Sequence, residues 1–101
     1  MRTKVHMSHV LAEKVNSART DDYQWQEAFL ERLLANTDAL PEDKEKLLPL
    51  LIPSDESVYQ FNLSDQDVEQ LDEIGHDLSR KGINKQLCKR AAVLRALIGL
   101  L

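Results

Sequence analysis

The clearest structural signal in this sequence is the run Val58-Tyr59-Gln60-Phe61-Asn62-Leu63-Ser64. Apolar and polar residues alternate along it, and a period of two is typical of a β-strand with one buried face. The alternation stops at Ser64, after which apolar residues recur every three or four positions, as in an amphipathic helix. The sequence therefore predicts a short strand that leads directly into a helix.

Two helices are predicted after this strand. Ser64 and Asp67 have the spacing of a capping box, in which two side chains satisfy the first free amides of a helix. This helix should end near Gly82, because glycine enters the left-handed region without a steric penalty, and Asn84 suits the N-cap of the second helix. The buried face of the first helix should comprise Val68, Leu71, Ile74, Gly75 and Leu78. The apolar surface of the second should comprise Leu87, Cys88, Ala91, Leu94, Ala96, Leu97, Ile98 and Leu101.

The order of strand, helix, Gly82-Ile83-Asn84 turn and helix resembles the ribbon-helix-helix family of dimeric DNA-binding proteins over residues 57–101. The run Gln60-Phe61-Asn62-Leu63 is similar to the DNA-contacting strand of the Arc-like members. Family members usually begin with this strand, give it Arg or Lys, and have an alanine-like residue where Gly75 stands. The resemblance implies a mainly α fold with one short β-strand, forming a ribbon-helix-helix dimer with a helical or partly disordered N-terminal extension.

Homodimer formation agrees with the physics of this segment. A segment of about 45 residues is too short to bury an adequate core alone, and a single strand has nothing to pair with. Two copies of the strand would pair antiparallel and place apolar side chains between the protomers. The predicted dimer core comprises Phe61, Leu63, Leu71, Leu87 and Leu94.

The family resemblance implies a sequence-specific DNA-binding protein, such as a transcriptional repressor or a plasmid-type regulator. Gln60 and Asn62 would point outward and contact bases of double-stranded DNA, because their amides match the N6/N7 edge of adenine in the major groove. Ser64 would chiefly cap its helix and also touch DNA. The predicted phosphate contacts are Asn84, Lys85 and Lys81, around the start of the second helix.

A different class of function stays open on the same residues. Gln and Asn are also ordinary residues on a solvated strand, and the net charge of −4 is unlike the basic footprint of a DNA-binding domain. No cation lies between Asp55 and Arg80. The alternative is a dimeric protein-interaction module, antitoxin-like or adaptor-like, with little or no DNA binding.

The N-terminal half divides by charge and apolar density. Residues 1–22 are predicted to be a mobile basic arm with few apolar side chains. Residues 23–56 form an acidic helical extension and linker, with helices over 23–36 and 41–48, the latter disrupted by Pro49. In this extension Trp25 and Phe29 either pack on the leucines of residues 47–51 or on the outside of the dimer, or they bind another protein partner.

Catalysis and metal binding find little support in the sequence. His6 and His9 could share a helix face, but the next soft ligand, Cys88, lies far along the chain. No phosphate-binding loop or paired nucleophile and base is visible, so neither an enzyme nor a cofactor is expected. The lack of a leader peptide or membrane span and the single cysteine predict a cytoplasmic protein.

Overall fold

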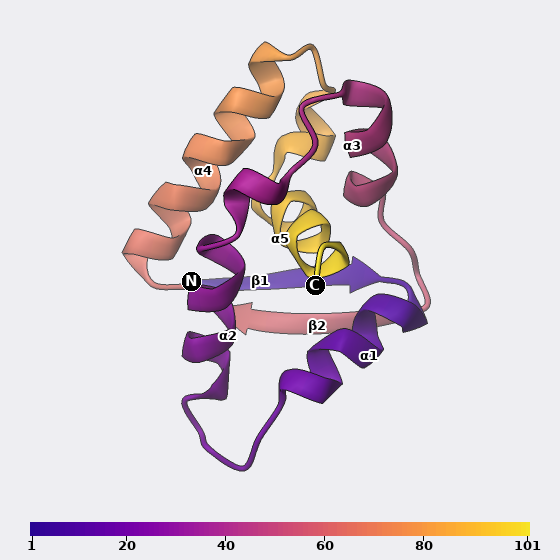
Figure 1. The fold of residues 1–101 in the computed structure, drawn as a ribbon. Coiled ribbons are helices and arrows are strands. Elements are labelled where there is room, and N and C mark those ends of the chain that lie inside the picture. The colour runs from indigo at the N-terminus through magenta and orange to yellow at the C-terminus, as the bar shows by residue number, and fades with distance from the viewer.

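The computed structural model describes all residues, 1–101, and is mainly helical with a two-stranded antiparallel sheet. Figure 1 shows the sheet crossing the molecule behind the helices. The elements in chain order are β1 (Arg2–Met7), α1 (His9–Ala18), α2 (Trp25–Leu34), η1 (Thr37–Ala39), α3 (Lys44–Leu51), β2 (Ser57–Asn62), α4 (Asp65–Arg80), η2 (Lys85–Cys88) and α5 (Arg90–Gly99), where η marks a short 3-10 helix.

The predicted strand at residues 58–63 is present as β2, but its partner comes from the same chain. Strand β1 pairs antiparallel with β2, with Lys4 opposite Gln60 in the middle of the register. The prediction of one strand is therefore wrong. The homodimer was expected because β2 had no partner strand in its own segment. In the structure β1 of the same chain is that partner.

Residues 1–22, predicted as a mobile arm, instead contain a strand and a helix. Val5 and Met7 of β1 and Val15 of α1 are completely buried. Ser8 caps α1 by accepting a hydrogen bond from the amide of Leu11 at 3.3 Å. Few apolar residues are needed here, because β1 pairs with β2 along its whole length.

Helix α4 begins as predicted. The hydroxyl of Ser64 accepts from the amide of Asp67 at 3.1 Å, and the Asp67 carboxylate accepts from the amide of Ser64 at 3.0 Å, which completes the capping box. The helix ends in a Schellman motif, with Gly82 at φ 84° and the Ile83 amide bonded to the carbonyl of Leu78.

The second predicted helix begins later than expected. Asn84 does act as a cap, but it caps the short η2, and α5 starts only at Arg90. A Cβ atom on Gly75 would lie 2.2 Å from the carbonyl oxygen of Cys88. Glycine is therefore needed in α4 so that the end of η2 can lie against the helix.

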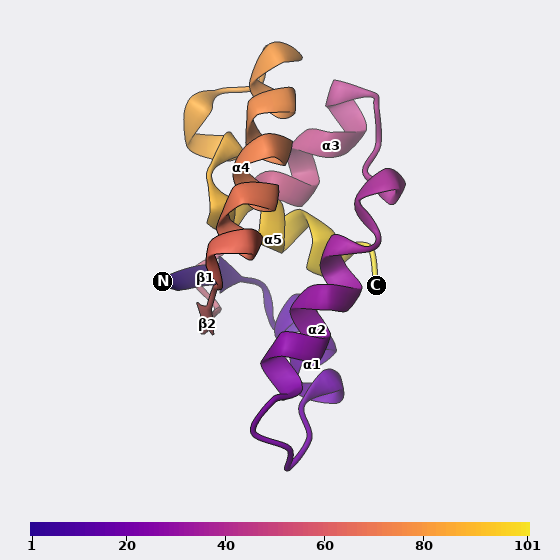
Figure 2. The ribbon, with the colours of Figure 1, turned by 90° about the vertical axis from the view of Figure 1, so that its left-hand side faces the viewer.

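Helix α5 is the centre of the core rather than one face of a dimer interface. Every residue from Ala92 to Ile98 is buried, including Arg95. The helix contacts β1 and helices α1 to α4, and a helix buried on all sides belongs in the middle of a fold. Figure 2 shows it between the sheet and the remaining helices.

A single hydrophobic core joins the three predicted regions. Val5 from the first, Phe29 and Leu47 from the second, and Phe61 and Leu94 from the third belong to one buried cluster. The aromatic rings of Phe29 and Phe61 stack with centroids 6.2 Å apart. Of the predicted dimer core, Phe61, Leu63, Leu71 and Leu94 are buried within this chain, and Leu87 is half-buried.

The helices of residues 23–56 differ from prediction at their ends. Helix α2 is shorter than the expected 23–36. Helix α3 starts at Lys44 and continues through Pro49 to Leu51, so the expected disruption at the proline is wrong. Pro49 removes one helical hydrogen bond, and the complete burial of Leu47 and Leu51 offsets this loss.

Candidate nucleic-acid interface

One surface of the sheet is free of helices. Figure 2 shows both strands at the edge of the molecule, with the helices on their inner side and above them. Side chains that alternate with the buried ones of β1 and β2 point to this outer side. We call this surface the ribbon face, and its six exposed residues are Arg2, Lys4, His6, Val58, Gln60 and Asn62.

The register of the strands pairs cations with amides on the ribbon face. Arg2 lies opposite Asn62 and Lys4 lies opposite Gln60, while His6 lies opposite Val58. Directly opposed residues have Cβ atoms about 4.5 to 5.5 Å apart. The ribbon face thus carries two cations and no carboxylate. The cations that the predicted strand lacks are supplied by β1.

These side chains suit the edges of base pairs. Asn and Gln can donate and accept at adenine N6 and N7, and Arg and Lys can donate to guanine O6 and N7. The major groove of duplex DNA admits a two-stranded ribbon. The predicted base-contacting pair, Gln60 and Asn62, is exposed on such a ribbon, with both side chains on the same side.

Side chains from two helices cover the outer edges of the ribbon. On the β2 edge, the Gln26 amide of α2 donates to the carbonyl of Gln60 at 3.1 Å and accepts from the amide of Asn62 at 3.2 Å. Because these bonds use the backbone of β2, the side chains of the ribbon face stay free. A covered edge also resists pairing with a strand of another molecule.

On the β1 edge the covering residue is buried. The Arg95 guanidinium of α5 donates to the carbonyl of His6 at 2.6 Å and to the carbonyl of Leu51. Burial lowers the pKa of Arg95, because the charged form loses hydration. Arg95 therefore joins the ribbon to the end of α3 through the core.

The other predicted DNA contacts are less well placed. Ser64 is exposed, but its hydroxyl caps α4. The Asn84 side chain accepts from the amide of Gln86 at 2.9 Å, and Lys85 is exposed in η2. Lys81 follows the last residue of α4, about 24 Å along the helix from the ribbon. The structure does not bring Lys81 to the ribbon face.

Arg90 is a basic residue near the ribbon that the predicted site omitted. Its guanidinium makes two hydrogen bonds of 2.8 Å to the carboxylate of Asp72 and lies 2.9 Å from the sulfur of Met1, just before β1. The hydrogen bond from Arg90 lowers the pKa of Asp72, and the same bond raises the pKa of Arg90. The first residue of α5 is thereby held beside the start of the ribbon.

Sequence reasoning also missed Arg2, Lys4 and His6. A signal was present, because Thr3, Val5 and Met7 alternate with these three polar residues at the period of a strand. Only two of the alternating positions carry strongly apolar side chains, so the pattern alone predicts part of a mobile arm.

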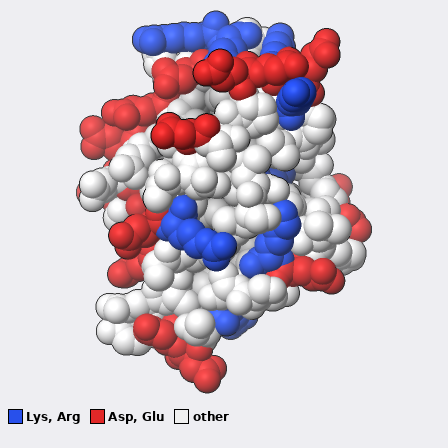
Figure 3. Space-filling view, viewed as in Figure 1, with Lys and Arg blue, Asp and Glu red and all other residues white.

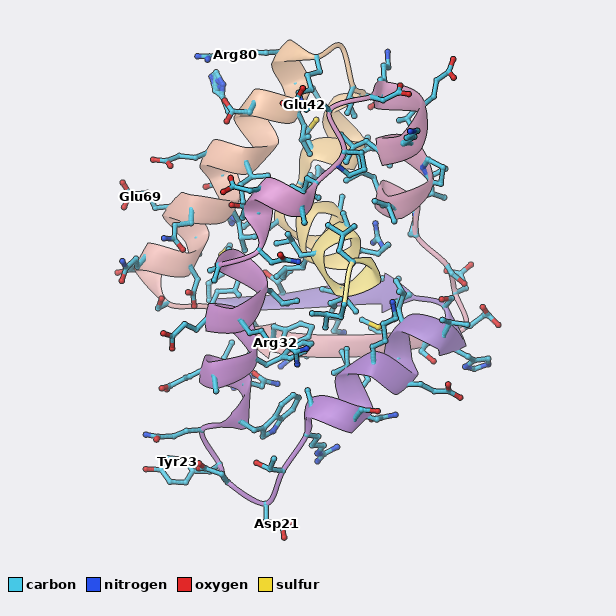
Figure 4. The ribbon with its side chains drawn as sticks, in the orientation of Figure 1. Asp21, Tyr23, Arg32, Glu42, Glu69 and Arg80 are labelled. Atoms are coloured by element: carbon cyan, nitrogen blue, oxygen red, sulfur yellow. The ribbon has the colours of Figure 1, made fainter.

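Acidic residues surround the helical side of the molecule. Figure 3 shows carboxylates along the outer side of α4, and Figure 4 shows Glu69 pointing away from that helix. Between α2 and α4 lies a groove of about 810 Å³. Its lining includes Glu27, Glu31, Leu34, Asp67 and Gln70. Carboxylates therefore lie along α4 and in the groove, which reaches the ribbon at Asn62.

No protein-family model, curated protein or solved structure matches this chain. None of its helices combines the length and the apolar character that crossing a bilayer would require.

Proposed function

We propose that this protein binds duplex DNA by inserting the ribbon face into the major groove, with Gln60 and Asn62 contacting bases. The observation that carries the proposal is the exposed ribbon face, on which two cations stand directly opposite two amides. The role is that of a sequence-specific regulator, such as a repressor or plasmid-type regulator, as the ribbon-helix-helix resemblance implies.

The charge distribution supports this function better than the net charge does. Attraction to DNA depends on the charge that faces the phosphates, and the field of distant carboxylates is screened within about 10 Å at ordinary salt. Arg2 and Lys4 lie on the ribbon face, which carries no carboxylate. Glu69 points away from α4, whereas Glu27 and Glu31 lie in the groove that ends at Asn62. Binding should therefore be weak at high salt and strengthen as salt is lowered.

The test is a fluorescence-anisotropy titration of labelled duplexes with the full chain at several salt concentrations. Replacing Lys4 with Ala should weaken binding and make the logarithmic salt dependence shallower by about one unit if Lys4 neutralises a phosphate. The Gln60→Ala/Asn62→Ala double variant should lose about 1 to 3 kcal/mol of discrimination per base contact while keeping its helical circular dichroism.

The matched control is Arg32→Ala. Arg32 is an exposed cation on α2, which lies on the helical side of the molecule (Figure 4). Its removal changes the net charge as much as Lys4→Ala does, but it should leave DNA affinity nearly unchanged. Equal losses in the two variants would mean that binding follows net charge alone, and the ribbon face would not be the interface.

A second candidate is a protein-interaction module, favoured by the acidic groove between α2 and α4. Carboxylates of Glu27 and Glu31 beside the apolar Leu34 suit a basic, partly apolar segment of another protein. A lysine-rich amphipathic peptide should then bind the chain and lose affinity in a Glu27→Gln/Glu31→Gln variant. Peptide binding without any DNA binding at low salt would favour this module over the DNA-binding function.

A further inference from the structure

Residues 2–18 and 58–74 form two strand-cap-helix units of the same design. Ser8 and Ser64, which cap α1 and α4, stand 56 positions apart. With this offset, 14 of 17 aligned positions have the same degree of exposure, although only Ser8 and Glu13 are identical to their equivalents. The burial pattern therefore repeats where the sequence does not.

Antiparallel pairing relates the two units by an approximate two-fold axis. Lys4 is the cross-strand neighbour of Gln60 and also its equivalent at the offset of 56, so the axis passes through this pair. Figure 1 shows the consequence: α1 leaves one end of the ribbon and α4 leaves the other end, in opposite directions. The backbone of a single chain thus has the approximate two-fold symmetry that a ribbon of two identical chains would have.

The chemistry of the ribbon face does not share this symmetry. One end carries Arg2 beside Asn62, and the other carries His6 beside Val58. The two-fold axis would exchange Arg2 with Val58, a cation with an apolar side chain. Val58 is 52% exposed on a face whose other residues are all polar.

From this asymmetry we infer that a single chain recognises a DNA site without two-fold symmetry, whose two ends differ in the bases they require. This inference rests on the DNA binding proposed above. The Arg2 and Asn62 end should select a guanine and an adenine, because their side chains make bidentate hydrogen bonds to these bases. At the other end, Val58 should select a thymine, whose C5 methyl group is the apolar feature of the major groove.

The first experiment is selection of binding sites by the full chain from a library of random duplexes, followed by titration of the enriched duplex. Non-palindromic sites saturated by one chain per duplex are expected. Palindromic sites saturated by two chains would overturn the inference but leave the proposed DNA binding intact. Binding without any enriched sequence would also overturn it, and no binding at low salt would remove the proposed function as well.

The second experiment tests the end that carries Val58. Replacing the selected thymine by deoxyuridine removes only the methyl group, and the parent should then bind about fourfold more weakly, as expected for one buried methyl. The Val58→Ala variant should bind the two duplexes about equally. A deoxyuridine penalty that persists in full in Val58→Ala would contradict the assignment of Val58 to this base.

Discussion

The two strand-cap-helix units differ in how far their helices run, and the difference shows what each unit does for the fold. Helix α1 ends at Ala18, whereas α4 continues past the equivalent Ile74 to Arg80. The continuation begins at Gly75, against which the carbonyl of Cys88 packs. The second unit thereby holds η2 and directs α5 into the core, while the first completes the ribbon.

The two units share their pattern of buried residues but differ in their exposed residues. Val5 and Met7 of β1 are buried like their equivalents, Phe61 of β2 and Leu63 directly after it. Among the exposed residues, a cation, Lys4, is the equivalent of an amide, Gln60. Packing thus constrains the inner side of both strands, while the ribbon face is free to differ between them.

The largest expected effect comes from the inner side of the ribbon. Phe61→Ala should lower the free energy of unfolding by about 3 to 5 kcal/mol, because a completely buried ring is lost from its stack with Phe29. Val5→Ala should cost about 2 kcal/mol. Urea unfolding followed by circular dichroism measures both. A Val5→Ala variant as stable as the parent would mean that β1 is the mobile arm expected from sequence.

Variants at the two edges of the ribbon should show the next largest losses of stability. Arg95→Met should cost about 2 to 3 kcal/mol, since the carbonyls of His6 and Leu51 lose their donor inside the protein. Gln26→Ala, at the other edge, should cost about 1 kcal/mol or less, because water can replace its exposed bonds. Thermal unfolding of the two variants should rank them in this order, and the reverse ranking would contradict a buried role for Arg95.

The two serine caps should have similar, smaller effects. Ser8→Ala and Ser64→Ala are each expected to lower stability by about 1 kcal/mol, because each leaves a helix amide without its side-chain acceptor. Ser79→Ala, at an exposed position within α4, is the control and should be close to neutral. If Ser8→Ala matches this control in urea unfolding, α1 contributes no capped helix and the two units are not equivalent.

The smallest loss of stability is expected at position 72 of α4, which is the equivalent of position 16 in α1. Asn16 accepts a hydrogen bond from the hydroxyl of Tyr59, whereas Asp72 accepts from Arg90. Because the folded-state pKa of Asp72 is lowered, its stabilisation is present above the unfolded value of 3.8 and is lost as the pH falls through the folded value. At pH 7, Asp72→Asn should cost less than about 1 kcal/mol, since the pair is partly exposed.

The check is the stability difference between Asp72→Asn and the parent at several pH values. It should shrink as the pH falls below 3.8, where the parent loses the same charge. A difference that grows toward acid pH would contradict the lowered pKa of Asp72.

Local signals predicted β2, the Ser64 and Asp67 capping box and the Gly82 terminus, because each depends on residues within a few positions. Exposure of Gln60 and Asn62 followed from the same alternation. Strand β1 was missed because its stability comes from pairing with residues 50 or more positions away, which no local pattern reports.

The prediction for α5 is wrong for a related reason. Sequence alone predicts that a second copy covers its apolar residues, because a 45-residue segment has nothing else to cover them. In the structure β1 and helices α1 to α3 supply that cover. The candidate site was therefore only half predicted: its amides came from the strand signal, and its cations lay on the strand that was missed.

The most direct test of DNA binding by the ribbon face is NMR mapping of backbone and side-chain resonances of the full chain during titration with a short DNA duplex. The largest shifts are expected at residues 2–6 and 58–62 together, with the side-chain amides of Gln60 and Asn62 among them. Shifts concentrated at Glu27, Glu31 and Leu34 in the groove between α2 and α4, or at β2 without β1, would contradict this interface.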